Sequence, residues 1–150
     1  MKTVPTDRVL LGTWPTPLEP AARLAEAIGL EPGRLWLKRD DLTGLGAGGN
    51  KVRKLEWTVS EALAAGADTL VTTGAPQSNH ARLTAAAACR IGLQAVLVFP
   101  GPPPTRASGN VVLDGLFGAQ VEWANGAGDA EDAEEALATA ALRVCNQLAA

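Results

Sequence analysis

The sequence has few of the residues that build a metal centre, a disulfide framework or a membrane span. It contains one histidine, His80, and two cysteines, Cys89 and Cys145, which lie far apart in the chain. One histidine argues against a zinc site, and two distant cysteines argue against a disulfide scaffold. Every apolar run is interrupted well before the roughly 18 residues of a membrane-spanning helix. We therefore expect no metal and no membrane partner.

Aromatic residues are also few, and neither sign of charge is in large excess. Aromatic residues make up 4% of the chain and tyrosine is absent, which leaves little surface for stacking nucleic-acid bases. Thirteen Lys and Arg against sixteen Asp and Glu give a net charge of −3, so we expect no nucleic-acid partner. The N-terminal residues lack the apolar stretch of a signal peptide, which favours a cytoplasmic location. What is present is 150 residues of 47% hydrophobic composition, enough for the core of one domain.

Strand-like and helix-like runs alternate through most of the chain. We expect strands at residues 35–38, 69–73, 93–99 and 119–123. We expect helices at residues 19–28, 52–65, 80–91, 109–117 and 129–148. Strands that alternate with helices of ten or more residues predict an α/β fold, in which a parallel sheet is flanked by helices.

A glycine-rich loop at residues 44–49 precedes the second of these helices. Its letters satisfy G-x-G-x-x-G, but Asp68 precedes the next strand instead of ending it, and Asn50 stands where a P-loop has lysine. Nucleotide binding is therefore a weak interpretation. Lys51 follows the loop at a helix start, where the helix dipole disfavours an ammonium group and favours the nucleophilic amine. A solvated surface lysine is the alternative.

A second polar segment, residues 72–82, joins a strand end to a helix start, the edge where parallel α/β sheets bind ligands. Ser78 and Asn79 are good N-cap residues, so helix capping alone explains them. The free N–H groups there could also bind a carboxylate, and the Asn79 amide could bond a phenolic oxygen. His80 could act as an acid or base or be structural. The residue types leave both interpretations open.

Four segments in order carry a family resemblance: KRDDLT at 38–43, GGNKVRKLE at 48–56, GAPQSNHAR at 74–82 and DGLFGAQV at 114–121. They resemble the ACC deaminase/D-cysteine desulfhydrase family, and the resemblance runs from about residue 16 to 123. These enzymes depend on pyridoxal 5′-phosphate and have the tryptophan-synthase-β-like fold, also called fold type II. The resemblance implies that fold for this chain.

The resemblance also implies roles for five residues. Lys51 would form a Schiff base with pyridoxal phosphate and act in catalysis, and Asn50 and Asn79 would contact the cofactor, Asn79 at its 3-oxygen. Ser78 would be catalytic and, with Asn79 and His80, would bind a small amino-acid substrate. The implied reaction is a D-cysteine desulfhydrase-type β-elimination that gives pyruvate, ammonia and sulfide.

ACC deaminase and L-cysteate sulfo-lyase are the alternatives within the resemblance. His80 favours a sulfur or sulfonate leaving group, because ACC deaminases usually carry glutamine at this place. If the chain does not carry out the family's chemistry, the alternative is an inactive α/β fragment.

The resemblance finally implies that the chain is truncated. Family members are roughly twice as long, which suits two domains, and their phosphate-binding loop lies in the second half. Residues 1–52 would be the N-terminal segment of a large domain, residues 53–150 an incomplete small domain, and the rest of the large domain would be absent. We therefore expect little turnover and exposed apolar surface in the N-terminal segment. A homodimer would be a property of a full-length form.

Overall fold

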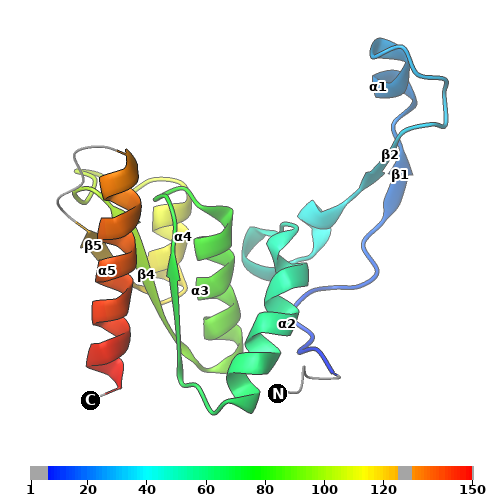
Figure 1. The fold of residues 1–150 in the computed structure, drawn as a ribbon. Helices are drawn as coiled ribbons and strands as arrows, with labels where there is room; N and C mark the ends of the chain where they lie inside the picture. The colour runs from blue at the N-terminus through cyan, green and yellow to red at the C-terminus, as the bar shows by residue number, and fades with distance from the viewer. Residues whose placement is uncertain (1–6, 125–129, 150) are drawn as a thin grey trace.

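The computed structural model describes residues 7–124 and 130–149. Figure 1 shows the arrangement of its helices and strands. In chain order these are β1 (Leu18–Pro20), α1 (Ala22–Ala27), β2 (Trp36–Lys38), the 3-10 turns η1 (Asp40–Leu42) and η2 (Leu45–Ala47), α2 (Lys51–Ala64), β3 (Thr69–Thr73), α3 (Asn79–Ile91), β4 (Gln94–Pro100), α4 (Asn110–Leu116), β5 (Gln120–Ala124) and α5 (Ala130–Leu148).

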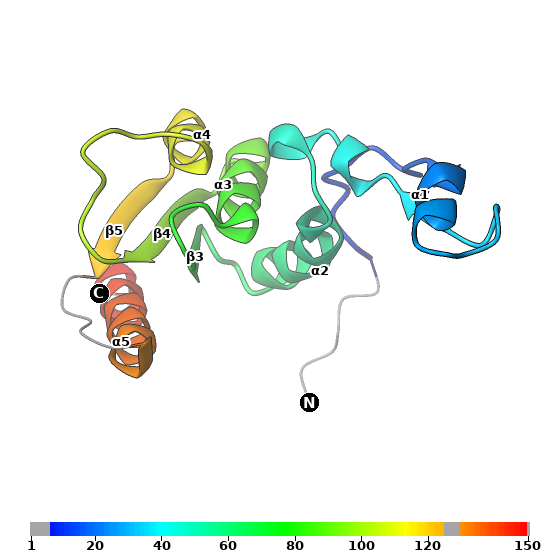
Figure 2. The same ribbon diagram turned by 90° about the horizontal axis from the view of Figure 1, so that it is seen from above.

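A three-stranded parallel sheet with helices on both faces confirms the predicted α/β fold. The strand order is β3-β4-β5, so β4 lies in the centre. Residues 95–99 of β4 are all buried, as expected of a strand covered on both faces. Seen from above, α3 and α4 cover one face and α5 covers the other (Figure 2).

Each face of the sheet has its own apolar cluster. Toward α3, the side chains of Leu97 and Phe99 pack against alanines of that helix. Toward α5, Val96 and Val98 pack against Val144 and its neighbours. The alternation of these four strand residues between the two faces is the period of two that a strand imposes.

Helix α3 is buried on nearly every side, which explains its alanine content. Its residues 81–88 are all buried. The sheet lies against one side of it, and α2 and η2 pack against other sides. A Cβ placed on Gly46 of η2 would lie 2.6 Å from the Ala86 Cβ, so the loop backbone rests directly on the helix. The glycine-rich loop is therefore seated on α3.

An N-terminal arm projects from this body (Figure 1). The arm is the antiparallel pair of β1 and β2, with α1 between them. The prediction of one helix over residues 19–28 is wrong, because Glu19 pairs with Leu37 in this ladder and Ala21 N–H donates to the Leu35 carbonyl at 2.9 Å. The helix begins only at Ala22.

The other predicted elements are confirmed to within about two residues at each end. The expected strand at 69–73 has those bounds, and the strands expected at 93–99 and 119–123 are each displaced by one residue. Residue 129, where the last helix was expected to begin, lies outside the described residues. None of the described helices combines the length and apolar character that a bilayer crossing requires.

Candidate active site

Lys51 is the first residue of α2, directly after the glycine-rich loop. Asn50 is the N-cap residue, yet its side chain makes no capping hydrogen bond, so its amide is not committed to the helix. The Lys51 side chain is exposed. An exposed primary amine at the positive end of a helix is thus placed where an external carbonyl group can reach it.

The backbone just before Lys51 is held in one conformation by close packing. Gly48 has φ +75°, and a Cβ there would lie 1.9 Å from the Asp41 carbonyl oxygen. The next N–H, that of Gly49, donates to the Asp40 carbonyl at 2.9 Å and to Thr43 Oγ1 at 3.0 Å. Glycine at position 48 is therefore a steric requirement of the loop.

Ser78, Asn79 and His80 lie together at the start of α3. Ser78 is the N-cap residue, and its Oγ accepts a hydrogen bond from the Ala81 N–H at 3.2 Å. Since this bond uses an acceptor site, the Ser78 O–H is still able to donate. Asn79 is the first helical residue and is exposed, whereas His80 is half-buried. The predicted capping role is confirmed for Ser78.

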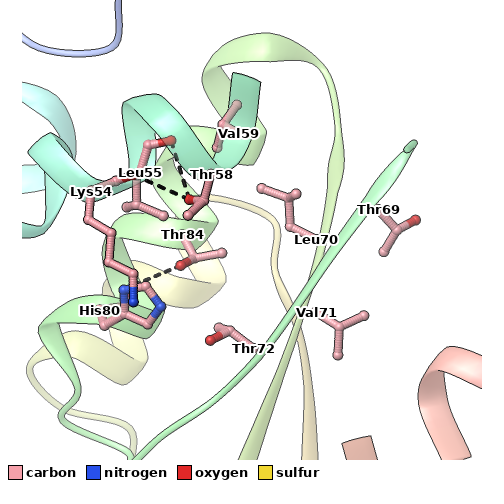
Figure 3. A pocket seen from close by; sticks show the side chains of 10 residues that line it. All are labelled: Lys54, Leu55, Thr58, Val59, Thr69, Leu70, Val71, Thr72, His80 and Thr84. Carbon is pink, nitrogen blue, oxygen red and sulfur yellow. Dashed lines mark hydrogen bonds between the residues drawn. The ribbon is translucent and has the colours of Figure 1, made fainter. Parts of the chain in front are cut away.

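His80 borders a cavity of about 260 Å³ between α2, β3 and α3 (Figure 3). Burial lowers the pKa of His80, and the nearby charges of Lys54 and Lys51 lower it further. The imidazole is consequently neutral at neutral pH. Lys51 and Ser78 are not among the residues that line this cavity.

A buried guanidinium connects the two helix starts. Arg82 lies in the first turn of α3 and is 8% exposed. Its Nη2 donates to the Gly48 carbonyl at 2.8 Å, and its Nη1 donates to Asn110 Oδ1 at 3.4 Å. The structure therefore brings the loop before Lys51 next to α3, and the fields of both Lys51 and Lys54 reach His80.

Sequence reasoning missed Arg82 and Asn110 as parts of the site. The available signal was an arginine shortly before a run of four alanines, and an asparagine at the start of the next helix. Neither pattern shows its partner, because the contacts join residues 28 and 34 positions apart.

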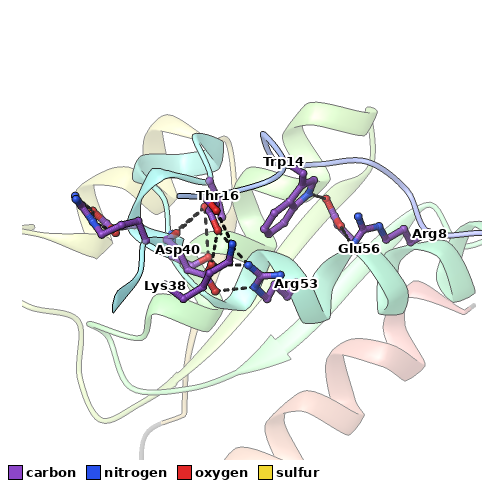
Figure 4. A network of polar contacts seen from close by, with 11 residues as sticks. Arg8, Trp14, Thr16, Lys38, Asp40, Arg53 and Glu56 are labelled. Carbon is purple, nitrogen blue, oxygen red and sulfur yellow. Dashed lines mark hydrogen bonds and ion pairs between the residues drawn. The ribbon is translucent and has the colours of Figure 1, made fainter. Parts of the chain in front are cut away.

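A second polar network holds the first turns of α2 from the N-terminal side (Figure 4). The Trp14 ring lies between two guanidinium groups, 5.6 Å from Arg8 and 4.4 Å from Arg53. Arg53 donates to both oxygens of Asp40 at 2.7 Å, and this guanidinium holds the pKa of Asp40 below its ordinary value. Helix α2 is thus fixed within its first turn, two residues after Lys51.

Across residues 7–124 and 130–149, no group of three or more His, Cys, Asp and Glu side chains is arranged to hold a metal ion.

Comparison with known proteins gives a consistent set of matches. A family model described as "Pyridoxal-phosphate dependent enzyme" matches residues 9–148. Curated relatives named D-cysteine desulfhydrase include one from Serratia proteamaculans (strain 568), 46% identical over 129 residues, and one from Salmonella paratyphi B, 45% identical over 130 residues. Each alignment covers 83% of this chain.

A solved structure described as an ACC deaminase homologue matches with a TM-score of 0.80 and 39% sequence identity, over 95% of this chain. The share of these other proteins that the alignments cover is much smaller. The chain spans 38% and 39% of the two relatives and 41% of the solved structure, about two fifths of their length.

Proposed function

The chain belongs to the family of pyridoxal-phosphate-dependent enzymes, and we propose that it forms the lysine-bearing part of an active site that breaks down a small amino acid. The relatives named D-cysteine desulfhydrase favour D-cysteine as the substrate. The proposed reaction consumes D-cysteine and one water and releases pyruvate, ammonia and hydrogen sulfide. The exposed Lys51 amine at the start of α2 is the observation that carries the proposal.

The donor set at the two helix starts fits pyridoxal phosphate. A primary amine at Lys51 is the group that holds the aldehyde of this cofactor covalently. The amide of Asn50 is not used in helix capping, and Asn79 is exposed on α3. These two amides would contact the cofactor. When bound, the cofactor supplies an electron sink that stabilises negative charge at the substrate Cα.

Lys51 would also move the proton in the reaction. A neutral Nζ takes the Cα proton of the substrate once the amine is no longer engaged with the cofactor. The contact of Arg82 with the Gly48 carbonyl and the packing of Gly48 against Asp41 fix the backbone that leads to Lys51. Such fixing limits the positions that the amine samples, and accurate placement is a large part of general-base catalysis.

The start of α3 would bind the substrate carboxylate. The first N–H groups of a helix have no intrahelical partner, and the helix dipole favours an anion there. The Ser78 hydroxyl can donate to the same anion, because its acceptor site already holds the Ala81 N–H. We therefore assign Ser78 and Asn79 to substrate binding, with Ser78 as a second catalytic group.

His80 bears on the choice between a sulfur-linked substrate and ACC. The solved structure described as an ACC deaminase homologue keeps ACC deamination as a second candidate. The imidazole at position 80, whose pKa burial and the nearby lysines lower, can donate to or accept from a sulfur leaving group, which favours D-cysteine. L-cysteate, whose leaving group is also sulfur-linked, remains the third candidate, and His80 is assigned to the substrate side.

Trapping of the cofactor on the protein tests the proposal directly. The chain is mixed with pyridoxal phosphate, reduced with borohydride and analysed by peptide mass spectrometry. We expect a stoichiometric adduct at Lys51, its loss in Lys51→Ala, and its retention in Lys54→Ala, a lysine exposed on the same helix. Adducts spread over many lysines, or an undiminished yield in Lys51→Ala, would refute the proposed site.

Turnover is a separate measurement. The products identify the substrate: pyruvate with sulfide from D-cysteine, pyruvate with sulfite from L-cysteate, or 2-oxobutanoate with ammonia from ACC. His80→Gln is expected to reduce sulfide release from D-cysteine. A specific Lys51 adduct without turnover of any of them would support the inactive α/β alternative.

We also propose that residues 1–52 belong to a large domain and residues 53–150 to a small one, in a cytoplasmic enzyme. The arm that projects from the body supports this division, since several of its apolar side chains are exposed. A homodimer is proposed only for a longer form of the protein.

A further inference from the structure

We propose that Asn110, at the start of α4, is a positioning residue that sets the orientation of the Asn79 amide and leaves the Asn79 N–H₂ group free to donate to the cofactor. The inference rests on the proposed function and adds a residue to that site. It follows from the hydrogen-bonding capacity of four side chains.

The amide of Asn110 has only one orientation that its neighbours allow. Its Oδ1 accepts from Arg82 Nη1 at 3.4 Å, and its Nδ2 donates to the Gln77 carbonyl at 2.7 Å. A guanidinium has donors only, and a carbonyl oxygen is an acceptor only. Exchanging O and N in Asn110 would place donor against donor and acceptor against acceptor, so the orientation is fixed.

The orientation of Asn79 follows from that of Asn110. The same Asn110 Nδ2 donates to Asn79 Oδ1 at 3.1 Å. If the Asn79 amide were rotated, two N–H₂ groups would face each other at this distance. The carbonyl side of Asn79 is therefore occupied, and its N–H₂ side is directed away from Asn110. A donor is what an anionic phenolic oxygen of the cofactor requires.

The backbone around Asn110 is held by the Gln77 side chain. Its backbone N–H donates to Gln77 Oε1 at 2.9 Å, and Gln77 Nε2 donates to the Ser108 carbonyl at 3.1 Å. Gln77 also fills the space beside Gly109, where a Cβ would lie 2.4 Å from its Oε1. The loop before α3 and the start of α4 thus form one bonded unit.

Arg82 extends this unit to the lysine. The same buried guanidinium that orients Asn110 holds the Gly48 carbonyl, three residues before Lys51. The two proposed cofactor contacts, through Lys51 and through Asn79, are thereby linked by one buried side chain.

The isosteric variant Asn110→Asp removes the donor and keeps acceptors for Arg82. Its carboxylate would draw the Asn79 N–H₂ toward itself and away from the cofactor. We expect cofactor affinity at Lys51 to fall about tenfold, the loss that follows from one hydrogen bond. Asn110→Ala, which removes the side chain, should weaken binding to a similar degree. Thermal unfolding of each variant is measured in parallel.

A double-mutant cycle with Asn79→Ala separates positioning from general stability. If Asn110 acts through Asn79, the pair Asn79→Ala and Asn110→Asp binds the cofactor no more weakly than Asn79→Ala alone, within a factor of about two. If the two losses multiply, Asn110 acts by another route and the inference is wrong. Asn146→Asp, an exposed asparagine on α5, is the matched control and should bind as the parent chain does.

The failure of this inference is distinguishable from the failure of the proposed function. A parent chain that shows no specific Lys51 adduct would overturn both. A parent chain that binds, together with an Asn110→Asp variant that binds equally tightly, would overturn only the role of Asn110.

Discussion

At the residue scale, Glu56 is a fully buried carboxylate that accepts three hydrogen bonds at one of its oxygens. It is 0% exposed, and its Oε1 accepts from the backbone N–H groups of Leu11 and Gly12 at 3.0 and 3.1 Å and from Trp14 Nε1 at 2.5 Å. Arg8 lies 3.3 Å from the other oxygen. One side chain of α2 thus fixes the N-terminal segment against the helix that carries Lys51.

Removal of this carboxylate should be costly. Glu56→Ala leaves the N–H donors of Leu11, Gly12 and Trp14 without this acceptor, and we expect the free energy of unfolding to fall by about 3 kcal/mol. Glu61→Ala, at an exposed position of the same helix, should change it by less than about 0.5 kcal/mol. Urea unfolding followed by circular dichroism measures both. Equal losses in the two variants would contradict the role given to Glu56.

Asp114 presents the opposite case, a buried carboxyl group without a hydrogen-bond partner at either oxygen. Burial raises its pKa from the ordinary 3.8 to about 6, and the opposing field of Arg82 is too weak to cancel this. The folded chain therefore binds this proton more tightly than the unfolded chain does. The resulting stability is fully present below pH 3.8 and is lost as the pH rises through about 6.

Asp114→Asn should remove this dependence on pH. From pH 4 to pH 8, the stability of the variant relative to the parent should rise by about 3 kcal/mol, the equivalent of the pKa shift. Urea titrations of both proteins at one-unit pH intervals test this, and the comparison cancels the other titrating groups. A constant difference across the range would show that Asp114 does not titrate there.

At the element scale, the loop before α2 depends on a close approach of two backbone segments. Gly48 and Gly66 both have a positive φ, +75° and +74°, and Gly48 combines it with ψ 169°. A Cβ on Gly48 would collide with the Asp41 carbonyl, whereas a Cβ on Gly66 would meet nothing within 4 Å. The pair therefore compares a positive φ in open space with a positive φ at a position where a side chain would also collide.

Gly66→Ala should lower the free energy of unfolding by about 1 to 2 kcal/mol, the cost of alanine in the left-handed region. Gly48→Ala should cost more and should also reduce the yield of cofactor trapped on Lys51, because the loop must move. Unfolding titrations and the trapping experiment are applied to both variants. If Gly48→Ala and Gly66→Ala yield equal amounts of cofactor trapped on Lys51, the loop geometry does not position the lysine.

At the scale of the whole molecule, the arm leaves a large amount of apolar side chain in contact with solvent. Leu18, Ile28 and Trp36 are 58%, 59% and 51% exposed. Clustered exposed apolar residues promote association. The arm has only the β1–β2 ladder and one short helix to support it, so it contributes little core of its own.

We expect the chain to associate in a concentration-dependent manner through the arm. Leu18→Ser combined with Trp36→Ser should lower the weight-average mass in sedimentation at equal concentration. Leu142→Ser, at a position 63% exposed on α5, should leave it unchanged. A parent chain that remains monomeric up to high concentration would show that the arm does not drive association.

The sequence predicted the helices and strands of the body more accurately than those of the arm. In the body, alternating runs of apolar strands and helices fixed the element bounds to within about two residues, because each run fits one local period. In the arm, residues 19–28 have a helix-like composition, yet β1 pairs with β2 and delays the helix to Ala22. Pairing between segments some 20 residues apart overrides local preference, and no local pattern encodes it.

The sequence by itself determined the α/β class, the position of Lys51 at a helix start and the capping role of Ser78, because these depend on neighbours within a few residues. Only the tertiary structure decided that Arg82 contacts both Gly48 and Asn110, and that Asn110 bonds Asn79. Those contacts arise where two helix starts and a loop meet at one place in space. The hydrogen bonds formed there depend on how α3 packs against η2 and α4. The order of residues in the sequence does not show that packing.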